Sequence, residues 1–398
     1  MNRWIVGIGL TLTAVSTSQA QQVWVVGPPG PGVFSQDLKP AIDAAASGDI
    51  VLVKKGAGSG TPWSITGKSL TVIADRGVTD FLAAPGTISN LQASQRILLR
   101  GFSIFLHLTI TGAAGPVWLE DCHAYSTFFT PQGDTPILTI GGCASVTMQR
   151  CSAVGYQVDS PSPPAFQSTS SKLTLYDCYF RGAMGPDFTY LFPTWHGAIG
   201  AVIGGGFTFA SGTQFIGGSG GMYGCCNDNA VGEAGGAGLS LNGIGYFLNC
   251  PMIGGVGSWG PAGYGPDGPP FVGTPTFLTG FGHKFSITSP VRELGTAALT
   301  CIGQPGELAA VYISNDQMLA QPFLEFEGAL VAGLTNATSF LLGQIGPAGD
   351  LTIGITAPTL PPGLQGATLF AQSYFFDPQV SYLEIGPASA VVVLDGSL

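Results

Sequence analysis

The sequence of 398 residues carries 13 Lys and Arg against 23 Asp and Glu, a formal net charge of -10, and its basic residues form no cluster. Binding to nucleic acid or to an anionic membrane needs concentrated positive charge, so both kinds of partner are disfavoured. Only 9% of the residues are charged while 45% are hydrophobic, and Gly and Pro number 61 and 29. This composition excludes a disordered chain and favours strands joined by many turns, so we expect an all-β protein.

The N-terminal residues have the pattern of a secretory signal. Arg3 precedes an apolar run over residues 4–15, and the small residues Ser18 and Ala20 follow at the spacing of a signal-peptidase site. We therefore predict a signal peptide over residues 1–20 and an extracellular or cell-surface location. Later stretches fall short of the roughly 18 consecutive apolar residues of a membrane helix, so we expect no transmembrane segment in the mature chain. In an oxidising location the eight cysteines can form disulfides, but their spacing leaves the pairing open.

A single helix is predicted near the start of the mature chain, over residues 35–47. Ser35 can cap it, Leu38 and Ile42 recur at helical spacing, and Gly48 ends it. The apolar run 50–53 that follows is typical of a buried strand. A helix at this place would cover the open end of a stack of strands, which otherwise promotes aggregation.

Repeated pairs of short apolar strands, each separated by a Gly or Ser turn, occupy the middle of the chain. The predicted first strands are residues 64–66, 88–91, 108–111, 137–140, 165–168, 201–203 and 238–241. The predicted second strands are residues 70–74, 97–99, 117–119, 146–148, 173–175, 207–209 and 246–247. No single pair can bury its apolar face alone, so the pairs must stack as turns of a solenoid.

Each second strand ends in a corner at which the alternation of inward and outward residues breaks. In residues 117–122 strict alternation would bury a carboxylate, so the chain must turn at Glu120 or Asp121. Asp and Asn tolerate left-handed backbone angles, which suits Asp121, Asp177 and Asn249 to such a turn. The cysteines that follow the corners then point inward, where Cys packs as a small hydrophobic residue: Cys122, Cys151, Cys178 and Cys250.

These features resemble the right-handed parallel β-helix proteins, the superfamily that includes pectate lyases and many secreted bacterial proteins without assigned activity. The matching stretches are residues 47–53, 70–74 and 96–101 and the corners at Asp121, Asp177 and Asn249. The resemblance implies a right-handed parallel β-helix over residues 22–281, closed by the N-terminal helix. The scarcity of Lys and Arg and the lack of a carboxylate cluster for Ca²⁺ depart from the lyases and disfavour lyase chemistry.

After residue 281 the repeat ends, and short apolar or alternating segments indicate a small β-sandwich domain over residues 282–398. The segments are residues 294–302, 308–314, 323–326, 339–342, 351–355, 367–376 and 390–394. Residues 363–378 resemble the C-terminal β-sandwich of secreted, repeat-bearing proteins of environmental bacteria. We therefore predict two domains after the signal peptide.

Loops that lengthen toward the C-terminal turns of the solenoid are the favoured binding region. The insertions at residues 182–197, 217–236 and 254–273 follow the third strand of a turn, so they should leave the solenoid along one edge. Residues 187–196 combine aromatic rings, which can stack on sugar rings, with Asp and His, which can form hydrogen bonds or transfer protons. The alternative is that these aromatic residues form an apolar cluster that anchors a long loop. The candidate ligand-binding residues are Tyr190, Trp195, Tyr223, Trp259, Tyr264 and Asp267, and the candidate catalytic residues here are Asp187 and His196.

The charged residues of the corner column are a second candidate site. Arg100, Asp121, Arg150 and Asp177 are predicted to lie on successive turns about 4.8 Å apart. They would form an exposed charge ladder or, for Asp121 and Asp177, a catalytic acid/base pair. Asp228 and Glu233 offer oxygen ligands for Ca²⁺ without the spacing of a calcium loop, so a polar turn is the alternative there. No other metal or cofactor is predicted.

The favoured function is an exported, non-catalytic protein that binds polysaccharide or cell-surface components through these loops. The alternative is a carbohydrate-active enzyme, a glycoside hydrolase or polysaccharide lyase, and a third hypothesis is a structural coat component that assembles with itself. Formal matches to nucleophile and dinucleotide motifs at residues 217–221 and 255–260 are dismissed, because neither lies between a strand and a helix in this glycine-rich chain.

Overall fold

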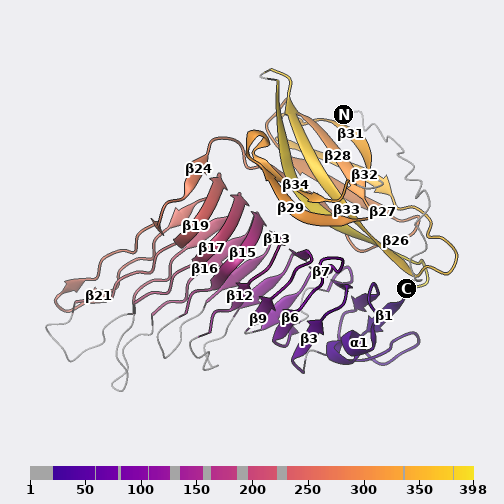
Figure 1. Cartoon of the computed structure of the whole chain (residues 1–398), viewed down its shortest axis with the longest axis horizontal. Helices are drawn as coiled ribbons and strands as arrows, with labels where there is room; N and C mark the ends of the chain where they lie inside the picture. Colours follow the sequence, from indigo (N-terminus) through magenta and orange to yellow (C-terminus); the bar gives the residue numbers. More distant parts are fainter. Residues whose placement is uncertain are drawn as a thin grey trace.

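The computed structural model describes residues 21–58, 60–78, 82–105, 107–125, 135–155, 163–185, 196–221, 231–334, 337–379 and 381–398. These residues form an all-β protein, with a long coil of parallel strands and a second group of mainly antiparallel strands beside it (Figure 1). The predicted fold class, a parallel β-helix with an N-terminal helix followed by a β-sandwich, is therefore confirmed. No helix within the described ranges is long and apolar enough to cross a membrane.

Three faces run along the coil, and each is a stack of parallel strands. The first face contains β3 (Trp63–Thr66), β6 (Gly86–Ser89), β9 (Leu108–Thr111) and β12 (Leu138–Gly141). The second contains β1 (Val23–Val26), β2 (Ile50–Val53), β4 (Leu70–Ala74), β7 (Ile97–Arg100), β10 (Val117–Glu120) and β13 (Val146–Gln149). The third contains β5 (Leu82–Ala83), β8 (Ser103–Phe105), β11 (His123–Tyr125), β14 (Ser152–Val154), β16 (Tyr179–Arg181), β18 (Gln214–Ile216) and β20 (Met252–Ile253).

Later turns of the coil differ from the predicted pattern of paired strands. Here one long strand bends from the first face onto the second, in β15 (Phe166–Tyr176), β17 (Ala201–Ser211) and β19 (Leu239–Leu248). The bend falls at Ser170, whose φ is 48°, and at Gly205 and Gly206, whose φ values are 72° and 78°. Parallel pairing resumes directly beyond the bend, so the turn does not separate two strands. The last turn consists of β23 (Phe271–Val272) and β24 (Thr276–Leu278).

The helix α1 (Leu38–Ala44) lies at the N-terminal end of the coil and is shorter than predicted. Asp37 occupies the N-cap position instead of Ser35, whose hydroxyl oxygen accepts a hydrogen bond from the Asp37 backbone N–H at 3.1 Å. Leu38 and Ile42 are buried in the core of the coil, as their spacing predicted. The helix therefore covers the apolar end of the stack.

The predicted left-handed corners are confirmed, with φ of 53° at Asp121, 51° at Asp177 and 48° at Asn249. Arg150 adopts the same conformation, with φ of 51°. The register of the first corner was predicted one residue off, because Arg100 pairs with Glu120 and not with Asp121. Gly101, with φ of 82°, supplies the left-handed residue of that turn.

The cysteine column that follows the corners packs inside the coil, as predicted. Cys122, Cys151 and Cys178 are buried members of its apolar core, and Cys250 packs against that core. Each thiol donates a hydrogen bond to the carbonyl oxygen two residues earlier, with S···O distances of 3.3–3.4 Å. These thiols are free, as are Cys143 and Cys301. The column therefore fills and hydrogen-bonds the inner side of each corner.

The strands from β25 onward form the sandwich. One sheet contains β25 (Lys284–Ile287), β27 (Thr296–Ile302) and β32 (Asp350–Thr356). The facing sheet contains β26 (Val291–Arg292), β34 (Tyr382–Leu394), β33 (Gly366–Asp377), β28 (Leu308–Ser314) and β31 (Thr338–Gln344). A hairpin of β29 (Gln317–Phe323) and β30 (Gly328–Ala332) completes it. Residues 323–326, predicted as a strand, include the 3₁₀ turn η1 (Leu324–Phe326).

The sandwich packs on the second face of the coil (Figure 1). Leu98 and Trp118 point away from the interior of the coil and join one apolar cluster with Phe370, Ala390 and Val392 of the sandwich. Trp118 is fully buried, and its ring centroid lies 5.2 Å from that of Phe370. The second face is therefore buried on both sides, which leaves the first face, the third face and the loops of the coil available for binding.

Candidate functional site

The three longest insertions project from the last turns of the coil as extended segments that run side by side (Figure 1). We call this assembly the loop platform. Its first layer consists of residues 182–185, 216–221 and 253–259, and its second layer of residues 196–200, 231–238 and 263–270. Within each insertion the chain leaves the coil in the first layer and returns in the second.

Backbone hydrogen bonds within each layer recur at every third residue, which is the repeat of the polyproline II helix. The N–H and C=O groups pair as Gly182 with Ile216, Gly185 with Ser219, Gly217 with Ile253 and Gly220 with Val256 in the first layer, at 2.8–3.0 Å. In the second layer they pair as Gly197 with Ala234, Gly200 with Ala237, Gly232 with Gly263, Gly235 with Pro266 and Gly238 with Pro269, at 2.9–3.1 Å. The platform is thus a hydrogen-bonded, sheet-like structure in which β-strand residues occur only where segments meet the coil and in the short hairpin of residues 259–264.

Further backbone bonds join the two layers in a zigzag. Gly218 donates to Ala198, Gly236 to Gly218 and Gly255 to Gly236, each at 2.8 Å. Glycine is required here by space, because a Cβ atom on Gly218 would lie 1.8 Å from the Ala183 carbonyl oxygen. The same addition at Gly236 would lie 2.0 Å from the Ala198 carbonyl oxygen. Neighbouring segments of a layer can therefore approach this closely only with glycine at these contacts.

Gly218→Ala is expected to lower the free energy of unfolding by about 1–3 kcal/mol, because the new methyl group overpacks a backbone contact that cannot give way. Urea unfolding measures this loss, and limited proteolysis tests whether the platform opens. Gly60→Ala is the control, since nothing lies within 4 Å of its added Cβ atom. That variant should change stability by less than about 0.5 kcal/mol. Equal effects of the two changes would contradict the close-packed platform.

The outer face of the first layer carries exposed apolar side chains at the three-residue repeat. Cβ atoms on Gly217 and Gly254 would point at the second layer, and those on Gly218 and Gly255 at the neighbouring segment of the same layer. The third position of the repeat therefore faces outward. It is occupied by Met184, Ile216, Ser219, Ile253, Val256 and Trp259, of which Met184, Ile253, Val256 and Trp259 are exposed.

A short hairpin closes the third insertion with two aromatic residues. Trp259 of β21 (Trp259–Gly260) pairs across the strands with Tyr264 of β22 (Gly263–Tyr264), and the two side chains are 49% and 74% exposed. Asp267 does not point away from the platform: its Oδ1 accepts a hydrogen bond from the Gly257 N–H at 2.8 Å. That N–H belongs to the last segment of its layer, so Asp267 caps an open edge.

The predicted catalytic His196 lies on the second layer with its side chain 73% exposed. Its Nδ1 lies 2.9 Å from Oε2 of Glu233, which the sequence suggested as a calcium ligand. Asp187, Tyr190, Trp195, Tyr223 and Asp228 lie outside the described residues. Among the side chains that the structure does place, no group of three or more His, Cys, Asp or Glu is arranged to bind a metal ion.

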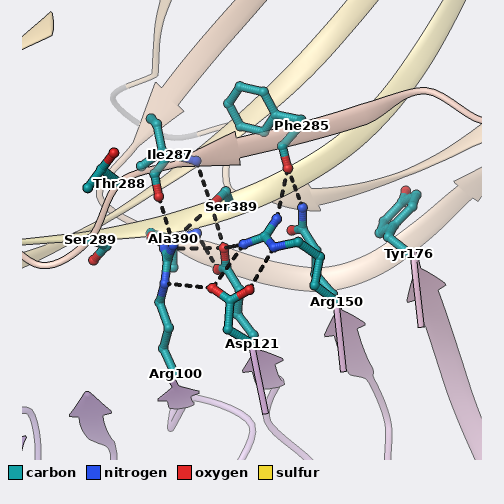
Figure 2. Close-up of polar contacts among 12 residues, drawn as sticks. Arg100, Asp121, Arg150, Tyr176, Phe285, Ile287, Thr288, Ser289, Ser389 and Ala390 are labelled. Carbon is teal, nitrogen blue, oxygen red and sulfur yellow. Dashed lines mark hydrogen bonds and ion pairs between the residues drawn. The ribbon is translucent and has the colours of Figure 1, made fainter. Parts of the chain in front are cut away.

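The corner column is an ion-pair network beneath the sandwich (Figure 2). Its centre is Glu120, whose fully buried carboxylate lies 2.6 Å from Nη2 of Arg150 and 3.2 Å from Nη1 of Arg100. The same carboxylate accepts hydrogen bonds from the Ser389 hydroxyl and from the Ala390 N–H. The alternative of an exposed charge ladder is therefore wrong for the first turns, because β34 of the sandwich covers them.

The two arginines also bind backbone carbonyl oxygens of the sandwich. Arg100 donates to Ile287 at 2.7 Å and to Ala390, and Arg150 donates to Phe285 at 2.9 Å (Figure 2). Backbone carbonyl groups of the sandwich thus accept hydrogen bonds from arginine side chains of the coil. The network fixes the position of β25 and β34 against the corner.

Asp121 and Asp177, the predicted acid/base pair, lie on either side of Arg150 in the corner column. Asp121 Oδ1 lies 2.7 Å from Nε of Arg150, and although burial opposes ionisation, this guanidinium holds the pKa of Asp121 below its usual value. Asp177 pairs with Lys284 at 2.9 Å, yet burial raises its pKa. Both carboxylates thus have structural partners, and a cation separates them.

A cavity of about 200 Å³ lies where the coil meets the sandwich, and the sequence did not single it out. Its buried His283 is held between two carboxylates, with Nε2 2.7 Å from Glu307 and Nδ1 2.8 Å from Glu384. Burial opposes the charge of the imidazolium, but the hydrogen bonds to both glutamates raise the pKa of His283 to about 9. The lining also includes Phe281, Glu327, Phe375, Asp377 and Tyr382. Residues so distant in sequence leave no local motif.

No protein-family model, no curated protein and no solved structure matches this chain.

Proposed function

We propose that this protein is an exported binding protein that attaches to polysaccharide through the outer face and hairpin of the loop platform. The observation that carries the proposal is the row of exposed apolar side chains at every third residue, ending in Trp259. Exposed apolar groups held on a hydrogen-bonded backbone bind with a smaller loss of conformational entropy than groups on a flexible loop. Aromatic rings add contacts with the C–H groups of sugars.

The rest of the molecule supports this assignment. The sandwich buries the second face of the coil, and the charged corner residues are used for that contact. In the platform, in contrast, glycine backbone groups hold six segments together, while Val256, Trp259 and Tyr264 remain exposed. A loop that served only to connect strands would need neither feature.

Trp259→Ala is expected to weaken binding to a glycan array by about tenfold, which corresponds to about 1.4 kcal/mol. The measurement is retention of the purified protein on the array, followed by titration with each glycan that retains it. Phe34→Ala is the matched control, because Phe34 is 50% exposed, close to the 49% of Trp259, but lies at the opposite end of the coil. Retention that is equally strong for wild type and Trp259→Ala would remove the platform as the binding surface.

A further inference from the structure

The outer face of the first layer is uncharged in the part of the chain that the structure describes. The chain carries a formal net charge of -10, yet the described residues at outward positions include no Asp or Glu. Arg181, at the junction with the coil, is the charged residue that borders this face. An acidic polysaccharide such as pectate or alginate would need several cations to bind, so the face is complementary to an uncharged ligand.

The shape of the face is set by the backbone beneath it. Neighbouring segments lie side by side through direct N–H to C=O bonds, about 5 Å apart, and outward residues repeat about every 9 Å along each segment. Ile216 therefore lies beside Ile253, and Ser219 lies between Met184 and Val256. This produces a level array of apolar groups in two directions. A single flexible chain would use only one row of it.

We infer that the ligand of the platform is a neutral, insoluble polysaccharide whose chains pack side by side, of the cellulose or chitin type. In a β-1,4-linked chain of this kind the hydroxyl groups are equatorial and the C–H groups form flat apolar faces. A sheet of such chains presents repeated apolar strips that can contact several rows of the platform at once, with Trp259 stacked on one ring. This inference rests on the proposed function and narrows it to one class of ligand.

The test compares full-length protein on five probes: microcrystalline cellulose, chitin, soluble hydroxyethyl cellulose, soluble starch and pectate. Wild type is expected to sediment with cellulose or chitin and to bind the soluble and acidic probes at least tenfold more weakly. Val256→Asp places a carboxylate in the middle of the face, where the side chain is 62% exposed, and should reduce sedimentation at least tenfold. Val231→Asp is the matched control, since that side chain is 53% exposed on the second layer.

The possible outcomes separate this inference from the proposed function. Trp259-dependent binding to a soluble or acidic probe, without binding to cellulose or chitin, overturns the inference and leaves the proposed function standing. If no probe shows Trp259-dependent binding, both are overturned. Sedimentation velocity without any glycan tests whether the outer face binds a second copy of the chain instead. A wild-type dimer that Val256→Asp converts to a monomer would show that it does, and would overturn the inference. A thermal melt of Val256→Asp that matches wild type confirms that the variant is folded.

Discussion

Glu120→Ala is expected to lower the free energy of unfolding by about 3–5 kcal/mol, the largest effect of any single change considered for this protein. The carboxylate is fully buried and faces both Arg100 and Arg150. Its removal leaves two guanidinium groups under the sandwich with one remaining carboxylate, Asp121, to compensate them. It also removes the acceptor of the Ser389 hydroxyl and of the Ala390 N–H.

The measurement is urea unfolding followed by circular dichroism, at neutral pH. Asp316→Ala is the matched control, because Asp316 also pairs with an arginine of the coil, Arg96 at 2.7 Å, but its side chain is 53% exposed. An exposed pair of this kind contributes about 0–1 kcal/mol. If the two variants lose the same small amount of stability, then the buried network does not hold the sandwich on the coil.

The sequence contained the signal for this contact, although the prediction did not use it. First-face strands such as β3 alternate between buried and exposed residues. Second-face strands such as β7 and β10 are buried at every position, and their sequences, ILLR and VWLE, are apolar on both sides before the charged end. A run that is apolar on both sides indicates a strand covered on both faces. Trp118 and Glu120 were therefore visible as candidates for a buried contact, but their distant partners in the sandwich, Phe370 and Ala390, were not.

The loop platform was predicted only as a set of long loops on one edge. Its glycines recur at intervals of three, as at Gly217 and Gly220 or at Gly232, Gly235 and Gly238, and this spacing matches the polyproline II repeat. Strands and helices have periods of 2 and 3.6, so a period of three matches neither and indicated only a loop. The segments that pair in the platform come from three insertions that are far apart in sequence, so their pairing has no local signal. The exposure of Trp259 and the capping role of Asp267 follow from that pairing and could not be predicted locally.

Stability is also expected to fall by about 2 kcal/mol between pH 6 and pH 8, because of His283. Both ring nitrogens of this buried residue lie beside carboxylates, Glu307 and Glu384, so the imidazole is bound as a cation. Its pKa rises from 6.5 to about 9 on folding. A group whose pKa is raised in the folded state contributes its full stability below the unfolded pKa and loses it as the pH rises through the folded pKa. At 1.36 kcal/mol per pKa unit the full contribution is about 3 kcal/mol.

Urea unfolding at half-unit steps from pH 6 to pH 8 measures this loss below the pH at which thiols ionise. Burial raises the pKa of Cys122 and Cys151 in the folded protein. These thiols therefore also lower the free energy of unfolding as the pH rises, but only above about pH 8.5, where thiols ionise in the unfolded chain. His123→Asn should leave the loss intact, because burial lowers the pKa of His123 and its contribution has the opposite sign. His283→Asn should abolish it. A wild-type stability that stays constant from pH 6 to pH 8 would show that His283 is not held as a cation.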